Sequence, residues 1–110
     1  MQEMLIVTMN DVPGYRIDEV YGEVFGLTVR SRNMFSQMGA GLQSLLGGEL
    51  KGMTTQLSDS RQQAISRLVD EARLKGGAAV IAMRFDASEL GTNWTEICAY
   101  GTAVRLSKIS

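Results

Sequence analysis

Hydrophobic and polar positions change period along this chain, from alternation to helical spacing and back to alternation. Met4–Met9 is short, apolar and β-branched, which predicts a strand. Tyr15–Val29 also looks extended, and its alternation slips at Asp18–Glu19, which predicts a β-bulge. Between them, Pro13 fixes φ at the second position of a turn, and Gly14 tolerates the positive φ of the third. The first thirty residues therefore predict two strands joined by a type II turn.

Apolar residues next recur at helical spacing in two segments. Asn33–Leu46 predicts a short helix, which its internal glycines weaken. Glu49–Thr55 is interpreted as a loop, and Ser58–Lys75 predicts a longer helix with Ser58 as N-cap and Gly76 just beyond its end. The expected buried stripe of this helix is Ala64, Ile65, Leu68, Val69 and Ala72. Its outer face is expected to carry the i,i+4 charge pairs of Arg67, Glu71 and Lys75.

The last third of the chain returns to alternation and predicts a β-hairpin. The two strands are Ala78–Asp86 and Trp94–Leu106, with Ser88–Asn93 as the loop between them. In the first strand, one face is expected to hold Ile81, Met83 and Phe85. In the second, one face holds Ile97, Ala99, Gly101 and Ala103, and the other holds Cys98, Tyr100, Thr102 and Val104. The small residues of that strand leave room for a helix or another subunit to pack closely.

The order of these elements predicts an α+β fold in a single domain spanning residues 1–110. The expected architecture has two layers, with a mainly antiparallel sheet, one long helix and one shorter helix. A chain of 110 residues suits one domain with a single modest core.

Composition excludes several classes of function. The net charge is −1, from 11 basic and 12 acidic residues, so we expect no nucleic-acid partner. The chain has no histidine, which excludes a catalytic triad that needs a His base. The one cysteine, Cys98, cannot form an intrachain disulfide and fits a reducing compartment, so we expect a cytoplasmic protein. No apolar run approaches the ~20 residues of a membrane span.

A few side chains could still carry chemistry. Glu96 and Cys98 lie two apart on a strand and share a face with neighbouring Asp86, which makes these three candidate metal ligands. The alternative is a structural cysteine beside surface carboxylates. An enzyme site formed between subunits could use Arg84, Asp86 and Tyr100. Trp94 and Tyr100 could stack on a ligand, or they could cover the core from the hairpin edge.

Two C-terminal motifs resemble a known family. They are Gly76–Asp86, which reads GGAAVIAMRFD, and Glu96–Arg105, which reads EICAYGTAVR. Both are similar to characteristic runs of the YbjQ-like family, named "putative heavy-metal-binding" and of unknown function. Ala79 stands where that family usually has Asn or Asp, and Ala82 stands where Gly is common.

The resemblance implies a dodecin-like subunit that assembles into a ring, with a pentamer as the expected form. Together with the missing catalytic groups, it leads to the hypothesis of a non-enzymatic homo-oligomer that binds a small ligand, as yet unidentified, or serves as a scaffold. The alternatives are a metal-binding protein with inter-subunit sites at Asp86, Glu96 and Cys98, and the inter-subunit enzyme described above.

Overall fold

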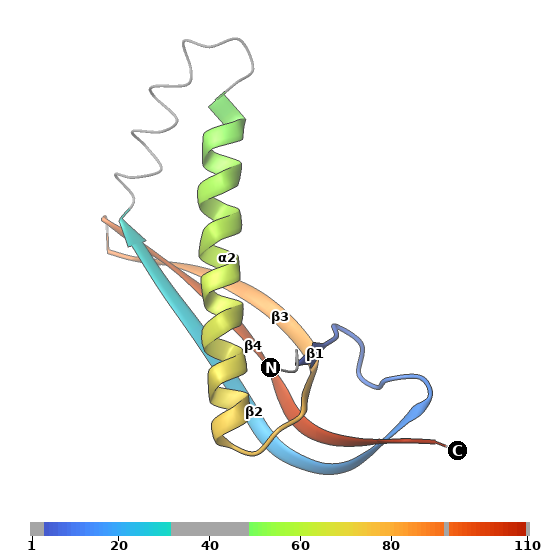
Figure 1. Cartoon of the computed structure of the whole chain (residues 1–110). Coiled ribbons are helices and arrows are strands. Elements are labelled where there is room, and N and C mark those ends of the chain that lie inside the picture. The colour runs from blue at the N-terminus through green and yellow to red at the C-terminus, as the bar shows by residue number, and fades with distance from the viewer. Residues whose placement is uncertain (1–3, 32–48, 92, 110) are drawn as a thin grey trace.

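The computed structural model describes residues 4–31, 49–91 and 93–109, and in these parts it contains four strands and one helix (Figure 1). The elements are β1 (Leu5–Ile6), β2 (Tyr15–Ser31), α2 (Glu49–Leu74), β3 (Ala79–Leu90) and β4 (Trp94–Lys108). The strands form one sheet in the order β1-β3-β4-β2, in which β1 and β3 are parallel and the other pairs are antiparallel. Because α2 covers one face of this sheet, the predicted two-layer α+β class is confirmed. The predicted helix Asn33–Leu46 lies outside the described residues.

Helix α2 begins earlier than the sequence pattern predicts. Glu49–Thr55 is helical rather than a loop, and Ser58 is an interior residue rather than the N-cap. The Ser60 hydroxyl donates to the Gln56 carbonyl at 2.9 Å, so a serine here is satisfied within the helix. A single glycine, Gly52, costs about 1 kcal/mol, which is too little to stop a long helix.

The predicted end of α2 is confirmed. Gly76 has φ +90°, and the Gly77 amide donates back to the Ala72 carbonyl at 2.8 Å. This is the geometry of a glycine-terminated helix, in which the last carbonyls are satisfied by amides just beyond the end.

The helix packs mainly on β2 and β4, and it scarcely touches β3. Its closest approach is at Gly26, where an added Cβ would overlap the Ala64 carbonyl oxygen and lie 2.5 Å from the Leu68 amide nitrogen. Ala99, opposite Gly26 on β4, is fully buried beneath the helix. The predicted close packing is therefore confirmed at Ala99 and Ala103, which pack with alanines of α2, whereas the space beside Gly101 is filled by Val80 and Met83 of β3.

Small side chains dominate the core between α2 and the sheet. The large apolar side chains that are fully buried there, among the described residues, are Leu68, Val24 and Val80. Four alanines lie beside them, namely Ala64, Ala72, Ala99 and Ala103. An alanine removes little apolar surface from water, so the part of the core that the structure describes supplies a modest hydrophobic driving force for folding.

A second, smaller apolar cluster lies on the opposite face of the sheet. Val12 packs there against Ile81 and Val104, because the segment between β1 and β2 crosses this face. The segment ends in the predicted turn, with Gly14 at φ +85° and the Tyr15 amide donating to the Val12 carbonyl at 3.0 Å. It covers the part of the open face near the chain termini and leaves the rest exposed.

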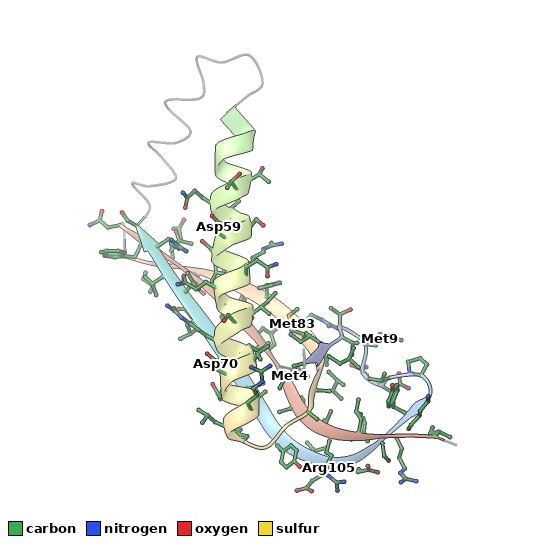
Figure 2. The ribbon with its side chains drawn as sticks, viewed as in Figure 1. Met4, Met9, Asp59, Asp70, Met83 and Arg105 are labelled. Atoms are coloured by element: carbon green, nitrogen blue, oxygen red, sulfur yellow. The ribbon has the colours of Figure 1, made fainter. Side chains whose placement is uncertain are left out.

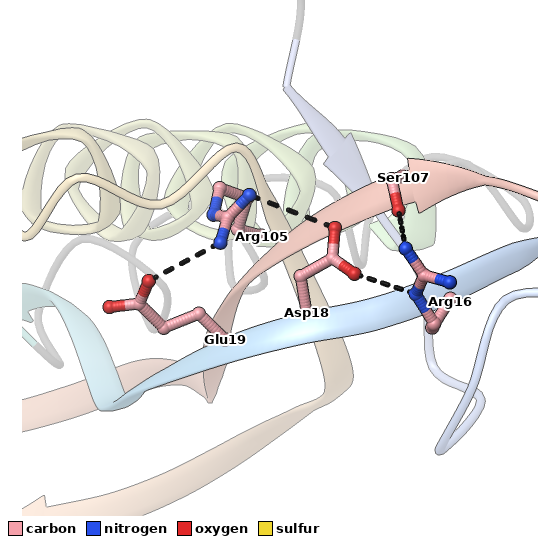
Figure 3. A network of polar contacts seen from close by, with 5 residues as sticks. All are labelled: Arg16, Asp18, Glu19, Arg105 and Ser107. Carbon is pink, nitrogen blue, oxygen red and sulfur yellow. Dashed lines mark hydrogen bonds and ion pairs between the residues drawn. The ribbon is translucent and has the colours of Figure 1, made fainter.

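The β-bulge expected at Asp18–Glu19 is confirmed by a register shift between Ile17 and Glu19. Ion pairs with Arg105 hold this irregular stretch to β4 (Figure 3). The Arg105 guanidinium lies 3.7 Å from the Asp18 carboxylate and 3.6 Å from that of Glu19. The Asp18 carboxylate also lies 2.8 Å from Nε of Arg16 on the same strand. Hydrogen bonding from Arg16 is the main reason why the pKa of the Asp18 carboxyl is lowered. The network therefore keeps Asp18 charged at a bulge where the backbone ladder is interrupted.

An unpredicted bulge in β3 overturns one expectation about its faces. Ala82 has φ +54°, and the pairing with β4 shifts between Ile81 and Arg84. As a result Ile81 joins the small cluster on the open face, whereas Met83 and Phe85 pack toward α2. The prediction that these three residues share a face is wrong, because the extra residue reverses the alternation.

The hairpin between β3 and β4 is tighter than expected. Leu90 pairs with Trp94, so Ser88, Glu89 and Leu90 belong to the strand and not to the loop. The sheet therefore extends well past the middle of α2.

Side chains of α2 cover the outer edge of β2. Lys75 donates to the Glu23 carbonyl at 2.7 Å, Glu71 accepts from the Phe25 amide at 3.3 Å, and Arg67 donates to the Leu27 carbonyl. Four helix residues rise about 6 Å and two strand residues about 6.7 Å, so the two spacings match. The Lys75–Glu71 pair at 3.6 Å is confirmed, but this face of α2 also meets the strand edge.

Replacing Gly26 by alanine should destabilise the fold strongly. The new Cβ would meet helix backbone at Ala64 and Leu68, which can yield only if α2 moves. We expect the free energy of unfolding to fall by about 3 kcal/mol or more, measured by urea denaturation at fixed protein concentration. The control is Ser66→Ala on an exposed position of α2, which should change stability by less than about 0.5 kcal/mol. A Gly26→Ala protein as stable as wild type would contradict the packing described.

Replacing Ala82 by glycine should stabilise the fold. Glycine adopts the positive φ of this position without the steric cost that alanine has. Glycine also loses more backbone entropy on folding than alanine does, which offsets part of this benefit. We therefore expect the free energy of unfolding to rise by about 0.5–1 kcal/mol. Ala87→Gly, in the same strand without a positive φ, should instead lose about that amount. A loss in both variants would show that Ala82 is not strained.

Candidate functional site

A group of exposed large apolar side chains gathers at one end of the molecule. This part, called the hairpin end, comprises Phe25–Ser31 of β2, Arg84–Tyr100 of the β-hairpin and Thr54–Ile65 of α2. Figure 1 shows that the N-terminal turns of α2 extend beyond the sheet here. The sheet therefore offers two surfaces at this end, one on each side.

The first surface lies on the face of the sheet away from α2. Along β2, Val24, Gly26 and Thr28 are buried toward the helix, so the residues between them point the other way. The strand register aligns these exposed side chains with β4 residues of the same face. The resulting set, called the open-face patch, is Phe25, Leu27, Val29, Trp94 and Tyr100, with exposed fractions of 37–49%.

The three candidate metal ligands share this open face. Asp86 lies directly opposite Cys98 across β3 and β4, and Glu96 lies two residues along β4. Nevertheless, within the described residues no three His, Cys, Asp or Glu side chains come close enough together to hold a metal ion. One chain therefore brings these residues to the same face without completing a site.

The Cys98 thiol is partly buried between these acidic groups. Burial raises the pKa of Cys98, and the negative charges of Glu96 and Asp86 raise it further. The thiol is therefore protonated at neutral pH, whereas nucleophilic and metal-binding cysteines act as thiolates. Its environment is the opposite of the electropositive one that activates a cysteine.

The residues considered for an inter-subunit enzyme also meet on this face. Arg84 pairs with Tyr100, and Asp86 follows two residues later on β3. The Arg84 guanidinium is bound to the Thr8 carbonyl at 2.7 Å and to the Met83 carbonyl at 2.9 Å. Arg84 thus ties the bulged part of β3 to the segment after β1.

Trp94 and Tyr100 do not cover the core from the hairpin edge. Both lie on the open face, exposed, with α2 on the other side of the sheet. Six residues of β4 separate them, which corresponds to about 20 Å along a strand. The two rings cannot hold one small ligand between them.

The second surface is a groove of about 480 Å³ between α2 and β3, on the helix side of the sheet. The residues that line this α2–β3 groove are Thr54, Leu57, Ser58, Arg61, Gln62, Ile65 and Phe85. The Arg61 guanidinium lies 5.0 Å above the centre of the Phe85 ring. The sequence reasoning missed this groove because it placed the first turns of α2 in a loop.

Two methionines, Met4 and Met83, belong to the apolar core on the helix side of the sheet. Met4 packs against the cluster that contains Met83, and both lie near β1 (Figure 2). A thioether adapts to irregular gaps, which suits the space beside the β3 bulge. Met83 is therefore not available as a soft metal ligand.

The one helix that the structure describes, α2, does not combine the length and apolar character needed to cross a membrane.

Comparison with known proteins identifies the family. A family model described as "Putative heavy-metal-binding", that of the YbjQ-like proteins, matches residues 4–107. A UPF0145 protein of Acidothermus cellulolyticus is 66% identical and covers 97% of this chain and 99% of its own length. One of Lactococcus lactis is 53% identical and covers 99% of this chain and all of its own.

A solved structure supports the fold independently. It is a protein of unknown function from the DUF74 family of Pediococcus pentosaceus, with a TM-score of 0.59 and 17% sequence identity. It covers 96% of this chain and all of its own length. Since the family model spans almost the whole chain and the relatives align nearly end to end, the chain belongs to the YbjQ-like family, whose function is unknown.

Proposed function

We propose that this protein is a non-enzymatic homo-oligomer of the cytoplasm, assembled as a ring, with five subunits as the expected number. The ring would serve as a scaffold or bind a small ligand. One observation carries the proposal: the hairpin end exposes several large apolar side chains on the open face of its sheet, and Leu57 of α2 is exposed on the other side. Contiguous exposed apolar patches indicate surfaces that are covered by a partner.

The weak core supports self-association. Four of the nine buried residues of the described core under α2 are alanines, which bury little apolar surface, while residues such as Phe25 and Trp94 are 44% and 49% exposed. Covering these side chains in an assembly removes apolar surface that one subunit cannot bury by itself. Folding and assembly would then share one driving force, and stability would depend on protein concentration.

The chemistry of the chain favours binding or scaffolding over catalysis. The chain has no histidine to act as a base near neutral pH. The one thiol has a raised pKa, which disfavours its use as a nucleophile. An active site built between subunits from Arg84, Asp86 and Tyr100 is the less supported alternative, because Arg84 already bonds two backbone carbonyls.

Metal binding between subunits is the other alternative, and the shared face of Asp86, Glu96 and Cys98 favours it. A second subunit would have to complete the ligand set, because the described part of one chain has no group of three suitable ligands. Binding of a soft metal would also have to displace the thiol proton of Cys98.

Native mass spectrometry of the protein purified from its own cell tests the assembly. We expect a discrete closed oligomer of five subunits, because apolar surfaces on both faces require partners on both sides. Sedimentation velocity on the same sample checks the result in solution. A monomer at micromolar concentration would contradict the proposal. A bound metal mass that disappears in both Cys98→Ala and Glu96→Ala would favour the metal alternative.

The Cys98 thiol should react slowly with iodoacetamide at pH 8. Its raised pKa reduces the thiolate fraction, so we expect slower alkylation in the native protein than in the urea-unfolded one. The rate should rise as pH increases toward the raised pKa. Glu96→Gln removes one negative charge and should accelerate alkylation, whereas the distant Glu23→Gln should not. Faster alkylation in the native state than in the unfolded state would contradict this environment.

A further inference from the structure

The open-face patch and the α2–β3 groove are different surfaces on opposite sides of the same sheet. The patch presents Phe25, Leu27 and Val29 from β2, and Trp94 and Tyr100 from β4. The groove presents Leu57, which is 42% exposed, with Ile65 and Phe85 partly buried beside it. Both surfaces therefore offer apolar side chains to a partner, and the groove adds polar ones around them.

Their charges are complementary. Next to the patch, Asp86 and Glu96 lie on the same face as Cys98 and raise its pKa. Arg84 adds one positive charge to this face, but its guanidinium is bound to the Thr8 and Met83 carbonyls, so the two carboxylates outnumber the cation beside the patch. The groove contains the cation Arg61, and none of the seven described residues that line it is acidic. An acidic apolar face and a basic apolar groove attract each other, whereas two copies of either surface would place like charges together.

Edge-to-edge strand pairing is not available where the patch is richest. The Glu23 carbonyl, the Phe25 amide and the Leu27 carbonyl are already bonded by Lys75, Glu71 and Arg67 of the same chain, whose side chains lie across this edge. Strand addition needs free backbone groups at a sheet edge. A partner at this end must therefore meet the face of the sheet rather than the edge of β2.

We propose that the open-face patch of one copy docks in the α2–β3 groove of the next copy, with Asp86 and Glu96 beside Arg61. The proposal rests on the oligomer proposed above and identifies its contact surfaces. Because the two surfaces differ, the contact is heterologous and repeats head to tail. Such a contact gives a ring if the rotation between neighbours closes, and a filament if it does not.

A single new cysteine tests this arrangement. Cys98 is the one natural cysteine and lies on the open face, and Ser58→Cys adds a thiol in the groove. The sheet separates the two thiols within one chain, so a short bismaleimide can join them only between copies. Because the Cys98 thiol reacts slowly, the reaction is run at alkaline pH until N-ethylmaleimide labels Cys98 fully in a parallel sample. Under these conditions we expect a ladder of cross-linked species, from dimers up to the full oligomer, on a denaturing gel. A two-fold contact between like surfaces would stop at dimers and overturn the proposal.

Matched variants make the result specific. Wild type carries Cys98 alone, and Ser58→Cys combined with Cys98→Ser carries the groove thiol alone. Both should stay monomeric on the gel, because the proposed contact joins unlike surfaces, and a strong dimer band in either would overturn it. Asp59→Cys, one residue outside the groove lining, should cross-link much less. Mass spectrometry of the wild-type oligomer separates the two proposals. An oligomer of normal size in which Ser58→Cys gives no ladder through Cys98 would overturn the docking and leave the oligomer standing, whereas a wild-type monomer would overturn both.

A charge exchange gives a second test that does not depend on cross-linking. Arg61→Glu should raise the concentration needed for assembly by about tenfold or more, because it faces two carboxylates. Combining it with Glu96→Arg should restore most of the loss. Circular dichroism should show that both variants retain secondary structure. Equal assembly of wild type and Arg61→Glu, or no recovery in the double variant, would overturn the docking.

Discussion

The approach of α2 to β2 at Gly26 is the constraint on which the rest of this structure depends. No side chain other than hydrogen fits between the strand and the helix backbone at Ala64 and Leu68. This close contact explains why the neighbouring core positions are alanines. A helix that lies so low on a sheet leaves no room for large side chains, and the core is correspondingly weak.

The same low position brings the charged side chains of α2 to the edge of β2. Arg67, Glu71 and Lys75 bond successive backbone groups of the strand, because the helical and strand spacings match. A long bare edge strand invites unwanted pairing, and this ladder closes it. The close approach of α2 to β2 therefore has two consequences. It limits the size of the core side chains, and it brings charged side chains of the helix to the edge of β2.

The sequence pattern predicted the parts of this fold that depend on local chemistry. The Pro13-Gly14 turn, the Gly76 helix end and the bulge near Asp18 are all confirmed. The β3 bulge at Ala82 could not be predicted from alternation, because alanine gives no sign of a positive φ. The start of α2 was missed because Ser58 resembles an N-cap, although a serine inside a helix can be satisfied by the preceding turn.

Coverage of the open face explains why candidate function concentrates at one end. Near the termini, Val12 and its neighbours cover Ile81 and Val104, so the chain buries these two residues of the open face itself. The hairpin end carries the open-face patch, the acidic pair Asp86 and Glu96, and the protonated Cys98 thiol. Negative charge beside apolar surface is costly to bury unless a cation accompanies it. The groove on the other side of the same sheet carries such a cation in Arg61. In the proposed contact, Arg61 of one copy would compensate the charges of Asp86 and Glu96 of the next.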